Sequence, residues 1–176
     1  SGPDDLSATV CAAYNPEFLF FDIVVVDDEH RNDNGTQTLW RGDAVQIAFD
    51  PYRDARKKKN LNVHGYFDDD LMLSAALTEQ GAWLYYERSP RAEFHKKAFA
   101  TDVRRDESTK TTHYRLQLPW AAFPQEFKPE TGKIIGFAVC ILDRDQNNSI
   151  AEYWLQSGPG LAGGQEPALL HGLLIE

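Results

Sequence analysis

Apolar and polar residues alternate with a period of two along most of the chain, and this alternation is typical of strands that bury one face. The periodicity of an amphipathic helix is almost absent. Turn residues such as Asn15-Pro16 and Asn34-Gly35 separate the alternating runs. We therefore expect about nine short strands, over residues 8–14, 18–26, 45–49, 71–78, 83–87, 92–105, 111–118, 133–142 and 151–155, before a closing segment at 169–175.

Two segments need a further argument. Leu71–Thr78 is rich in leucine, methionine and alanine, which suit a helix, but its length and the nearby Gly81 favour a strand paired with 83–87 in a hairpin. Pro119 to Phe123 predicts a short helical turn, because proline favours the first helical position. Together the elements predict a single all-β domain over residues 1–176, an antiparallel β-sandwich of jelly-roll or immunoglobulin-like type with little helix.

Composition narrows the possible partners. The chain has 176 residues, enough for one domain with a sizeable core, and a net charge of -9. This charge argues against binding to nucleic acid or to anionic membrane surfaces, which both attract clustered lysine and arginine. The basic run Arg56–Lys59 is the exception, and we interpret it as a solvated loop. The longest apolar run, Phe137–Leu142, is too short to span a bilayer.

The two cysteines, Cys11 and Cys140, both fall inside expected strands. One interpretation is that they are small, buried apolar residues. The other is a disulfide, which requires the two strands to be neighbours.

Five stretches carry a resemblance to a known family. They are EFLFFDIVVVDD at 17–28, LWRGDAVQIAFD at 39–50, YRLQLPW at 114–120, GKIIGFAVCILDRD at 132–145, and the closing segment 158–174. Together, and in this order, they resemble the family 9 carbohydrate-binding modules, and more loosely the DOMON superfamily of sugar-binding and haem-binding β-sandwiches. The family's usual opening segment, before the strand at Ala8, has no counterpart here, and a sandwich without that strand would expose an edge.

The resemblance implies a non-catalytic domain that binds an oligo- or polysaccharide. Such modules are often joined to a polysaccharide-active enzyme, so we expect other domains of a parent enzyme as partners and an extracellular or periplasmic location. In the sugar binders of the family, the terminal sugar is stacked between two tryptophans. Stacking works because the C–H face of a pyranose fits an indole ring while hydroxyls at the rim pair with polar groups.

The resemblance also assigns sugar-binding residues. Trp40, on the loop before the strand at Val45, falls on the first stacking position. The second position falls on Gly164, which cannot stack. The polar positions fall on Gln46, Ser74 and Ala76, and Gln46 can bond a hydroxyl whereas Ala76 cannot. With Asp43, which either orders the turn or touches ligand, the expected sugar-binding residues are Trp40, Asp43, Gln46 and Ser74.

The tryptophans also have simpler interpretations. Trp40 either acts as a sugar platform or caps the core. We expect Trp120, after a strand and a proline, and Trp154, on a late strand, to lie in the core. Trp83 shares a strand face with Tyr85, so an exposed aromatic strip is the alternative to burial there.

Acidic loops raise the question of a metal. Asp27-Asp28, Asp68–Asp70 and Asp143-x-Asp145-x-Asn147 offer the oxygen ligands that calcium takes. The last stretch is not a helix–loop–helix calcium loop, because it lacks the sixth-position glycine and has Trp154 in place of the bidentate glutamate. The resemblance implies structural calcium, which we assign to Asp27, Asp28, Asp143 and Asp145. The alternative is that these aspartates cap backbone N–H groups in turns.

Two other functions remain open, and a third class is disfavoured. The chain could be a structural or interaction domain of a larger secreted enzyme that has lost its sugar site. The superfamily also includes haem-binding electron-transfer domains, in which Met72 and one of the five histidines (His30, His64, His95, His113, His171) would be the axial ligands. No nucleophile–base motif, phosphate loop or zinc spacing is present, so we expect no catalytic residues.

Overall fold

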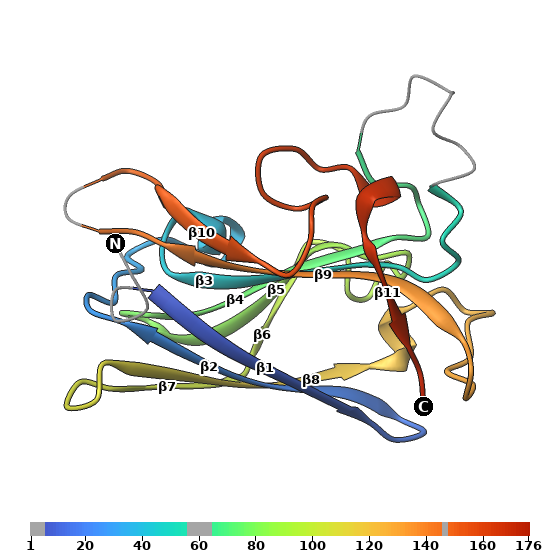
Figure 1. The fold of residues 1–176 in the computed structure, drawn as a ribbon, viewed down its shortest axis with the longest axis horizontal. Coiled ribbons are helices and arrows are strands. Elements are labelled where there is room, and N and C mark those ends of the chain that lie inside the picture. Colours follow the sequence, from blue (N-terminus) through green and yellow to red (C-terminus); the bar gives the residue numbers. More distant parts are fainter. Residues whose placement is uncertain (1–5, 56–64, 146–147) are drawn as a thin grey trace.

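The computed structural model describes residues 6–55, 65–145 and 148–176 (Figure 1). Within these ranges the chain forms eleven strands and three short 3₁₀ segments, η1 to η3. The elements are β1 (Leu6–Tyr14), β2 (Phe18–Asp27), η1 (Thr36–Arg41), β3 (Ala44–Asp50), β4 (Leu71–Thr78), β5 (Gly81–Arg88), β6 (Lys97–Ala100), β7 (Asp102–Asp106), β8 (Thr111–Pro119), η2 (Trp120–Ala122), β9 (Ile134–Asp143), β10 (Tyr153–Gln156), η3 (Pro167–Leu169) and β11 (His171–Leu174).

The strands form two antiparallel sheets that pack face to face (Figure 1). Sheet A has the order β1-β2-β8-β7, and sheet B has the order β10-β9-β3-β4-β5-β6. β11 pairs with the first half of β9. The predicted all-β sandwich is confirmed. No helical segment in the described ranges is long and apolar enough to cross a membrane.

Alternation along the strands creates the core between the sheets. In β2, Leu19, Phe21, Ile23 and Val25 are buried, whereas Asp22 on the other face is exposed. Each such large apolar side chain contributes about 1.5–3 kcal/mol on burial. As predicted, Trp120 belongs to this core, and its indole N–H donates to the Asn15 carbonyl oxygen at 2.9 Å.

The expected strand over 92–105 was wrong. The chain first turns at 91–96, where the N–H groups of Phe94 and His95 bond the Arg91 carbonyl oxygen. It then forms β6 in sheet B, and after Thr101 it forms β7 in sheet A. Period-two alternation continues from β6 into β7. The pattern predicts which side chains are buried, but it does not predict which sheet a strand joins.

Sheet B is also buried on the face turned away from sheet A, which we call the outer face. A second apolar cluster lies there, formed by small strand residues and by side chains from the segments that cover them: Leu39, Ala44, Ala48, Tyr66, Met72, Ala76, Tyr85, Ala138, Cys140, Leu142, Leu161 and Leu170. η1 contacts β3, β4 and β5 on this side. In Figure 1, η1 and the loop before β11 lie above sheet B, opposite sheet A.

The two cysteines lie in different sheets, Cys11 on β1 and Cys140 on β9, and both are free thiols. A disulfide between them is therefore absent. Cys140 is buried as expected, but the expected burial of Cys11 was wrong, because β1 is the edge strand of sheet A and most of it is exposed. The basic run Arg56–Lys59, together with His64 and Asn147, lies outside the described residues.

Candidate functional site

Antiparallel pairing aligns residues in rows across the outer face of sheet B, because directly opposed residues point to the same side. One row runs from Gln156 through Cys140, Gln46 and Ser74 to Tyr85. Cys140 and Tyr85 belong to the outer-face cluster, which fixes the side to which this row points. Two predicted sugar-binding residues, Gln46 and Ser74, are therefore direct neighbours on this face.

Gln46 and Ser74 share a third partner that the sequence prediction missed. The Gln46 side-chain amide donates to the Ser74 hydroxyl oxygen at 3.3 Å and to Glu87 Oε1 at 3.0 Å, and the Ser74 hydroxyl also donates to Glu87. Burial raises the pKa of Glu87, although the two hydrogen bonds oppose the rise. Alternation from Trp83 and Tyr85 points to Glu87 on the same face, and this signal could have identified it.

Trp40 lies on η1, above this face. Its neighbour Leu39 is fully buried in the outer-face cluster, whereas the Trp40 side chain is 37% exposed. The guanidinium carbon of Arg41 lies 5.3 Å from the Trp40 ring centroid, in a cation–π contact. Trp40 therefore offers a partly exposed indole beside the strands that carry the polar network.

Hydrogen bonds from the Asn32 side chain hold η1 against the start of β3. The buried Asn32 Nδ2 donates to the carbonyl oxygens of Leu39 at 2.8 Å and of Asp43 at 3.0 Å. A Cβ added at Gly42 would lie 2.7 Å from the Arg31 carbonyl oxygen. Only glycine fits at this position without movement of the neighbouring loop.

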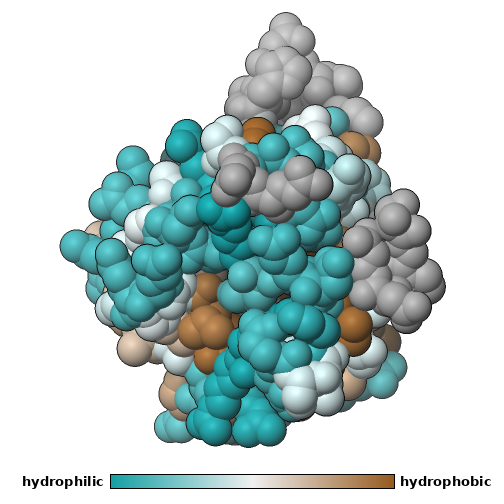
Figure 2. All heavy atoms as spheres, turned by 90° about the vertical axis from the view of Figure 1, so that its left-hand side faces the viewer, coloured by the Kyte–Doolittle hydropathy of each residue, from teal (hydrophilic) through white to brown (hydrophobic). Residues whose placement is uncertain are grey.

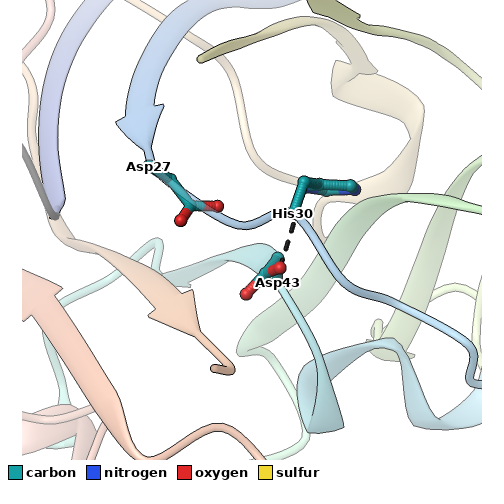
Figure 3. Close-up of side chains that lie close together, drawn as sticks. All are labelled: Asp27, His30 and Asp43. Carbon is teal, nitrogen blue, oxygen red and sulfur yellow. Dashed lines mark ion pairs between the residues drawn. The ribbon is translucent and has the colours of Figure 1, made fainter. Parts of the chain in front are cut away.

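The predicted sugar-binding residue Asp43 faces the loops at the end of the sandwich. Its carboxylate accepts the backbone N–H of Arg31 and that of Arg144, the latter at 2.6 Å. His30 Nδ1 lies 3.8 Å from Asp43 Oδ2, and Figure 3 shows this pair beside Asp27. Burial raises the pKa of Asp43 to about 8, against the effect of both N–H donors. Asp43 is only 3% exposed. Its carboxylate therefore connects its own loop to the loops that contain Arg31 and Arg144.

Trp154 was expected in the core, and this expectation was wrong. β10 pairs Trp154 with Leu142, which belongs to the outer-face cluster, so the indole is on the outer side of sheet B. It is 47% exposed. The reason is position, since β10 ends the strand order of sheet B and no described strand flanks its other edge.

The remaining aromatic and small positions fall as follows. Trp83 and Tyr85 share the outer face as predicted, but Tyr85 is buried and Trp83 is only half-buried, so they form no fully exposed strip. Ala76 is fully buried in the cluster. Gly164 is exposed, and no atom lies within 4 Å of the place where its Cβ would be.

The acidic loops converge at one end of the sandwich. Carboxylate oxygens of Asp27, Asp143 and Asp145 lie within 4.8 Å of one another, whereas Asp28 is exposed and outside this group. Burial raises the pKa of Asp27 to about 6, while Arg105, whose Nη1 lies 4.0 Å from Asp27 Oδ2, acts to lower it. Figure 2 shows this end of the molecule as mostly hydrophilic.

A second group of carboxylates lies at the opposite end of β3. Oxygens of Asp50, Asp69 and Asp70 come within 4.8 Å of one another. Asp70 is fully buried, accepts the Phe67 N–H at 2.7 Å, and has a pKa raised by burial to about 8. Asp68, the first residue of the predicted acidic run, is exposed and outside the group.

Comparison with known proteins agrees with this architecture. A family model described as "Carbohydrate family 9 binding domain-like" matches residues 1–158. A family 9 module from Caldicellulosiruptor kristjanssonii in complex with glucose has 15% sequence identity and a TM-score of 0.68, over 97% of this chain and 77% of that one. A module from the same organism in complex with cellotriose has 16% identity and a TM-score of 0.67, over 96% and 74%. No curated protein matches the chain. The chain belongs to the family 9 carbohydrate-binding domains.

Proposed function

We propose that this protein is a non-catalytic sugar-binding module that holds its ligand on the outer face of sheet B, with Trp40 as the platform. The observation that carries the proposal is the partly exposed Trp40 on η1, packed over the strands that bear Gln46, Ser74 and Glu87. The two similar structures are complexes with glucose and cellotriose, which supports glucose-based sugars as the first ligands to try.

Each group of this face has a part in holding a pyranose. The indole of Trp40 accepts the C–H face of the ring, and Arg41 can donate to hydroxyls at the ring's edge. The Gln46 side-chain oxygen and the Glu87 carboxylate offer acceptors at the polar floor, because both N–H groups of the Gln46 amide already donate to Ser74 and Glu87. Asp43 acts indirectly, by holding the loops on which η1 rests.

The proposal is tested by calorimetric titration with glucose, cellobiose and cellohexaose, followed by xylan, mannan, galactan and uronate oligosaccharides. Trp40→Ala removes the platform, so binding should be lost while the melting temperature changes by less than about 2 °C. Trp120→Ala is the matched contrast, because it empties the core and should cost about 3–5 kcal/mol of stability. A large loss of stability in Trp40→Ala would instead assign the indole to the core.

A second candidate function is a structural domain that keeps the family fold without binding sugar. Gly164, which stands at the second stacking position, favours it. Failure of the unmodified protein to bind every sugar in the panel would support this candidate over the first.

A structural calcium ion is part of the proposal. Asp27 and Asp143 are the last residues of β2 and β9, and Asp145 completes a set of hard oxygen donors that suits calcium. The ion would offset the repulsion between these carboxylates and fix the loops after β2 and β9. Asp28 lies outside the set and is no longer proposed as a ligand.

The proposed cellular setting rests on the family resemblance alone. Modules of this kind are often joined to polysaccharide-active enzymes, so the proposed partners are other domains of such an enzyme, and the proposed location is extracellular or periplasmic. Expression of the full-length gene product and assay of its other domains would test both points.

A further inference from the structure

We propose that β1 is an interface through which two copies of this chain associate. In the proposed dimer, the two β1 strands pair antiparallel about a two-fold axis at Val10, and the two copies of sheet A become one continuous sheet. This interface is separate from the proposed sugar site, which lies on the outer face of sheet B.

The free edge of β1 carries a regular row of backbone hydrogen-bonding groups, and no described strand pairs with this edge. The Asn15 N–H donates to the Phe18 carbonyl oxygen at 2.9 Å, so this pair and every second pair along the β1–β2 register exchange hydrogen bonds. The odd-numbered residues of β1 therefore bond β2. The even-numbered residues turn their N–H and C=O groups outward, and they are Leu6, Ala8, Val10, Ala12 and Tyr14.

The other edge of β2 shows the same alternation through two further bonds. The Asp27 N–H donates to the Lys110 carbonyl oxygen and the Trp120 N–H donates to the Glu17 carbonyl oxygen, each at 3.0 Å. Odd-numbered residues of β2 therefore bond β8, and even-numbered residues bond β1. Each even-numbered residue of β2 opposes an odd-numbered residue of β1, so both sets of bonds assign the same free row.

β1 lacks the features that normally protect an edge strand from pairing. Its nine residues, Leu-Ser-Ala-Thr-Val-Cys-Ala-Ala-Tyr, include neither a charge nor a proline, and most of its side chains are exposed. The strand at the other edge of sheet A, β7, has only five residues, Asp-Val-Arg-Arg-Asp, and is protected by their charges. This contrast within one sheet indicates that β1 pairs with a further strand.

A further strand would also cover apolar side chains that point between the sheets. Val10 opposes the core residue Ile23, and Leu155 on β10 opposes the core residue Ile141. Yet Val10 is 37% exposed and Leu155 is 42% exposed, because sheet A ends at β1. β1 contacts β10, and a groove of about 400 Å³ lies between β1 and β11. A strand added beyond β1 would extend sheet A on this side and bury more apolar surface.

A second copy of β1 fits this edge, because the strand is complementary to itself. With a two-fold axis at Val10, Ala8 of one copy opposes Ala12 of the other, and Leu6 opposes Tyr14. All the outward-turned residues then form hydrogen-bonded pairs, which gives about ten backbone bonds between the copies.

The distribution of charge also favours contact at this edge. The net charge of -9 makes other surfaces of two copies repel each other, whereas β1 itself carries no charge. Asp22, in the middle of β2, would lie three strand spacings from its equivalent in the second copy, which is about 14 Å. This separation exceeds the Debye length of about 8 Å at physiological ionic strength, so the repulsion between them is largely screened.

Sedimentation equilibrium from about 10 µM to about 1 mM protein tests the proposal, since an interface of one strand per copy should give a Kd on the order of 100 µM. In the proposed register, Thr9 of one copy opposes Cys11 of the other, and both side chains are exposed. Thr9→Lys with Cys11→Lys puts like charges opposite each other and should raise the Kd at least about tenfold. The matched control, Thr9→Lys with Cys11→Glu, puts opposite charges there and should not raise it.

Disulfide trapping in a buffer of reduced and oxidised glutathione checks the register. Thr9→Cys places two cysteines in a directly opposed pair that is not hydrogen-bonded, with Cα atoms about 4.5 Å apart, so the variant should form a disulfide-linked dimer. Ser7→Cys is the control, because position 7 opposes Ala13 and should give no such dimer. In the unmodified chain the two Cys11 residues are diagonal neighbours, about 7–8 Å apart, which is too far for a disulfide.

Three outcomes would overturn the proposed interface and leave the proposed function intact. The first is an unmodified chain that stays monomeric up to about 1 mM. The second is an equal Kd for the two double variants, which would assign the dimer to another surface. The third is a Thr9→Cys variant that cross-links no faster than Ser7→Cys, which would exclude a two-fold axis at Val10.

Discussion

At the scale of single residues, Glu87 illustrates how the face is organised by partners that are distant in sequence. Gln46 and Ser74 come from β3 and β4, and both bond one carboxylate from β5. The sequence predicted the first two through the family resemblance. Alternation from Trp83 and Tyr85 puts the third on the same face, but an acidic residue near a strand end is usually interpreted as a solvated side chain.

Substitution of this carboxylate should show a stability effect that depends on pH. Burial raises the pKa of Glu87, so the native state binds its proton more tightly than the unfolded chain does. Stability therefore falls as the pH rises from the ordinary pKa of 4.5 through the raised one. Glu87→Gln keeps the shape and removes the charge, so it should be more stable than the unmodified protein at pH 7 but not at pH 4, as measured by urea unfolding.

The exposed Glu79, one residue beyond β4, provides the control. Glu79→Gln should leave the unfolding midpoint unchanged at both pH values. Equal stability of Glu87→Gln and the unmodified protein at pH 7 would show that the carboxylate stays solvated or keeps its proton there.

At the scale of elements, strands were predicted well both where one face is solvated, as in β2 and β8, and where both faces are buried, as in β3, β4 and β9. β2, β3, β4, β8 and β9 begin and end within one residue of their expected bounds. The prediction failed at the chain crossing near Thr101, where alternation continues between sheets. It also failed for Trp154, because a strand pattern does not reveal that the strand is at an edge.

η1 has a glycine at each end, Gly35 and Gly42, and only Gly42 lies too close to its neighbours to accept a side chain. A Cβ at Gly42 would meet the Arg31 carbonyl oxygen and the Asn32 side chain at under 3.0 Å, while a Cβ at Gly35 would meet no atom within 4 Å. Gly42→Ala should therefore cost about 1–3 kcal/mol, and Gly35→Ala less than about 0.5 kcal/mol, in chemical unfolding.

The same pair of variants also tests the site. Gly42→Ala should weaken sugar binding, since it shifts the segment that holds Trp40, and Gly35→Ala should not. If the two variants were equally stable, the close approach of the loop to η1 would not exist in solution.

At the scale of the whole molecule, buried carboxyl groups at both ends of β3 link stability to pH and to cations. Burial raises the pKa of Asp27 to about 6 and those of Asp43 and Asp70 to about 8, from an ordinary value of 3.8. The native state therefore binds more protons than the unfolded chain between these values. In the presence of EDTA, the melting temperature should fall as the pH rises from about 5 to about 8.

Calcium should reverse this fall, because it binds only the ionised carboxylates. The rise in melting temperature on adding calcium should be larger at pH 8 than at pH 5, and Asp145→Asn should reduce it. Asp28→Asn, outside the carboxylate group, is the control and should respond like the unmodified protein. A calcium response that is equal in both variants would remove Asp145 from the proposed site.

The pairing order of sheet A affects how the chain folds during synthesis, because β2 pairs with a strand that is translated much later. β2, the most apolar strand of that sheet, lies between β1 and β8, and roughly 80 residues separate its end from the start of β8. At about 5–20 residues per second, a ribosome needs on the order of 4–16 s to supply β8 after β2 has emerged. During that interval, the nascent chain exposes the strand Phe-Leu-Phe-Phe-Asp-Ile-Val-Val-Val with one edge unpaired. The yield of folded protein should therefore depend on chaperones that shield this strand until β8 arrives.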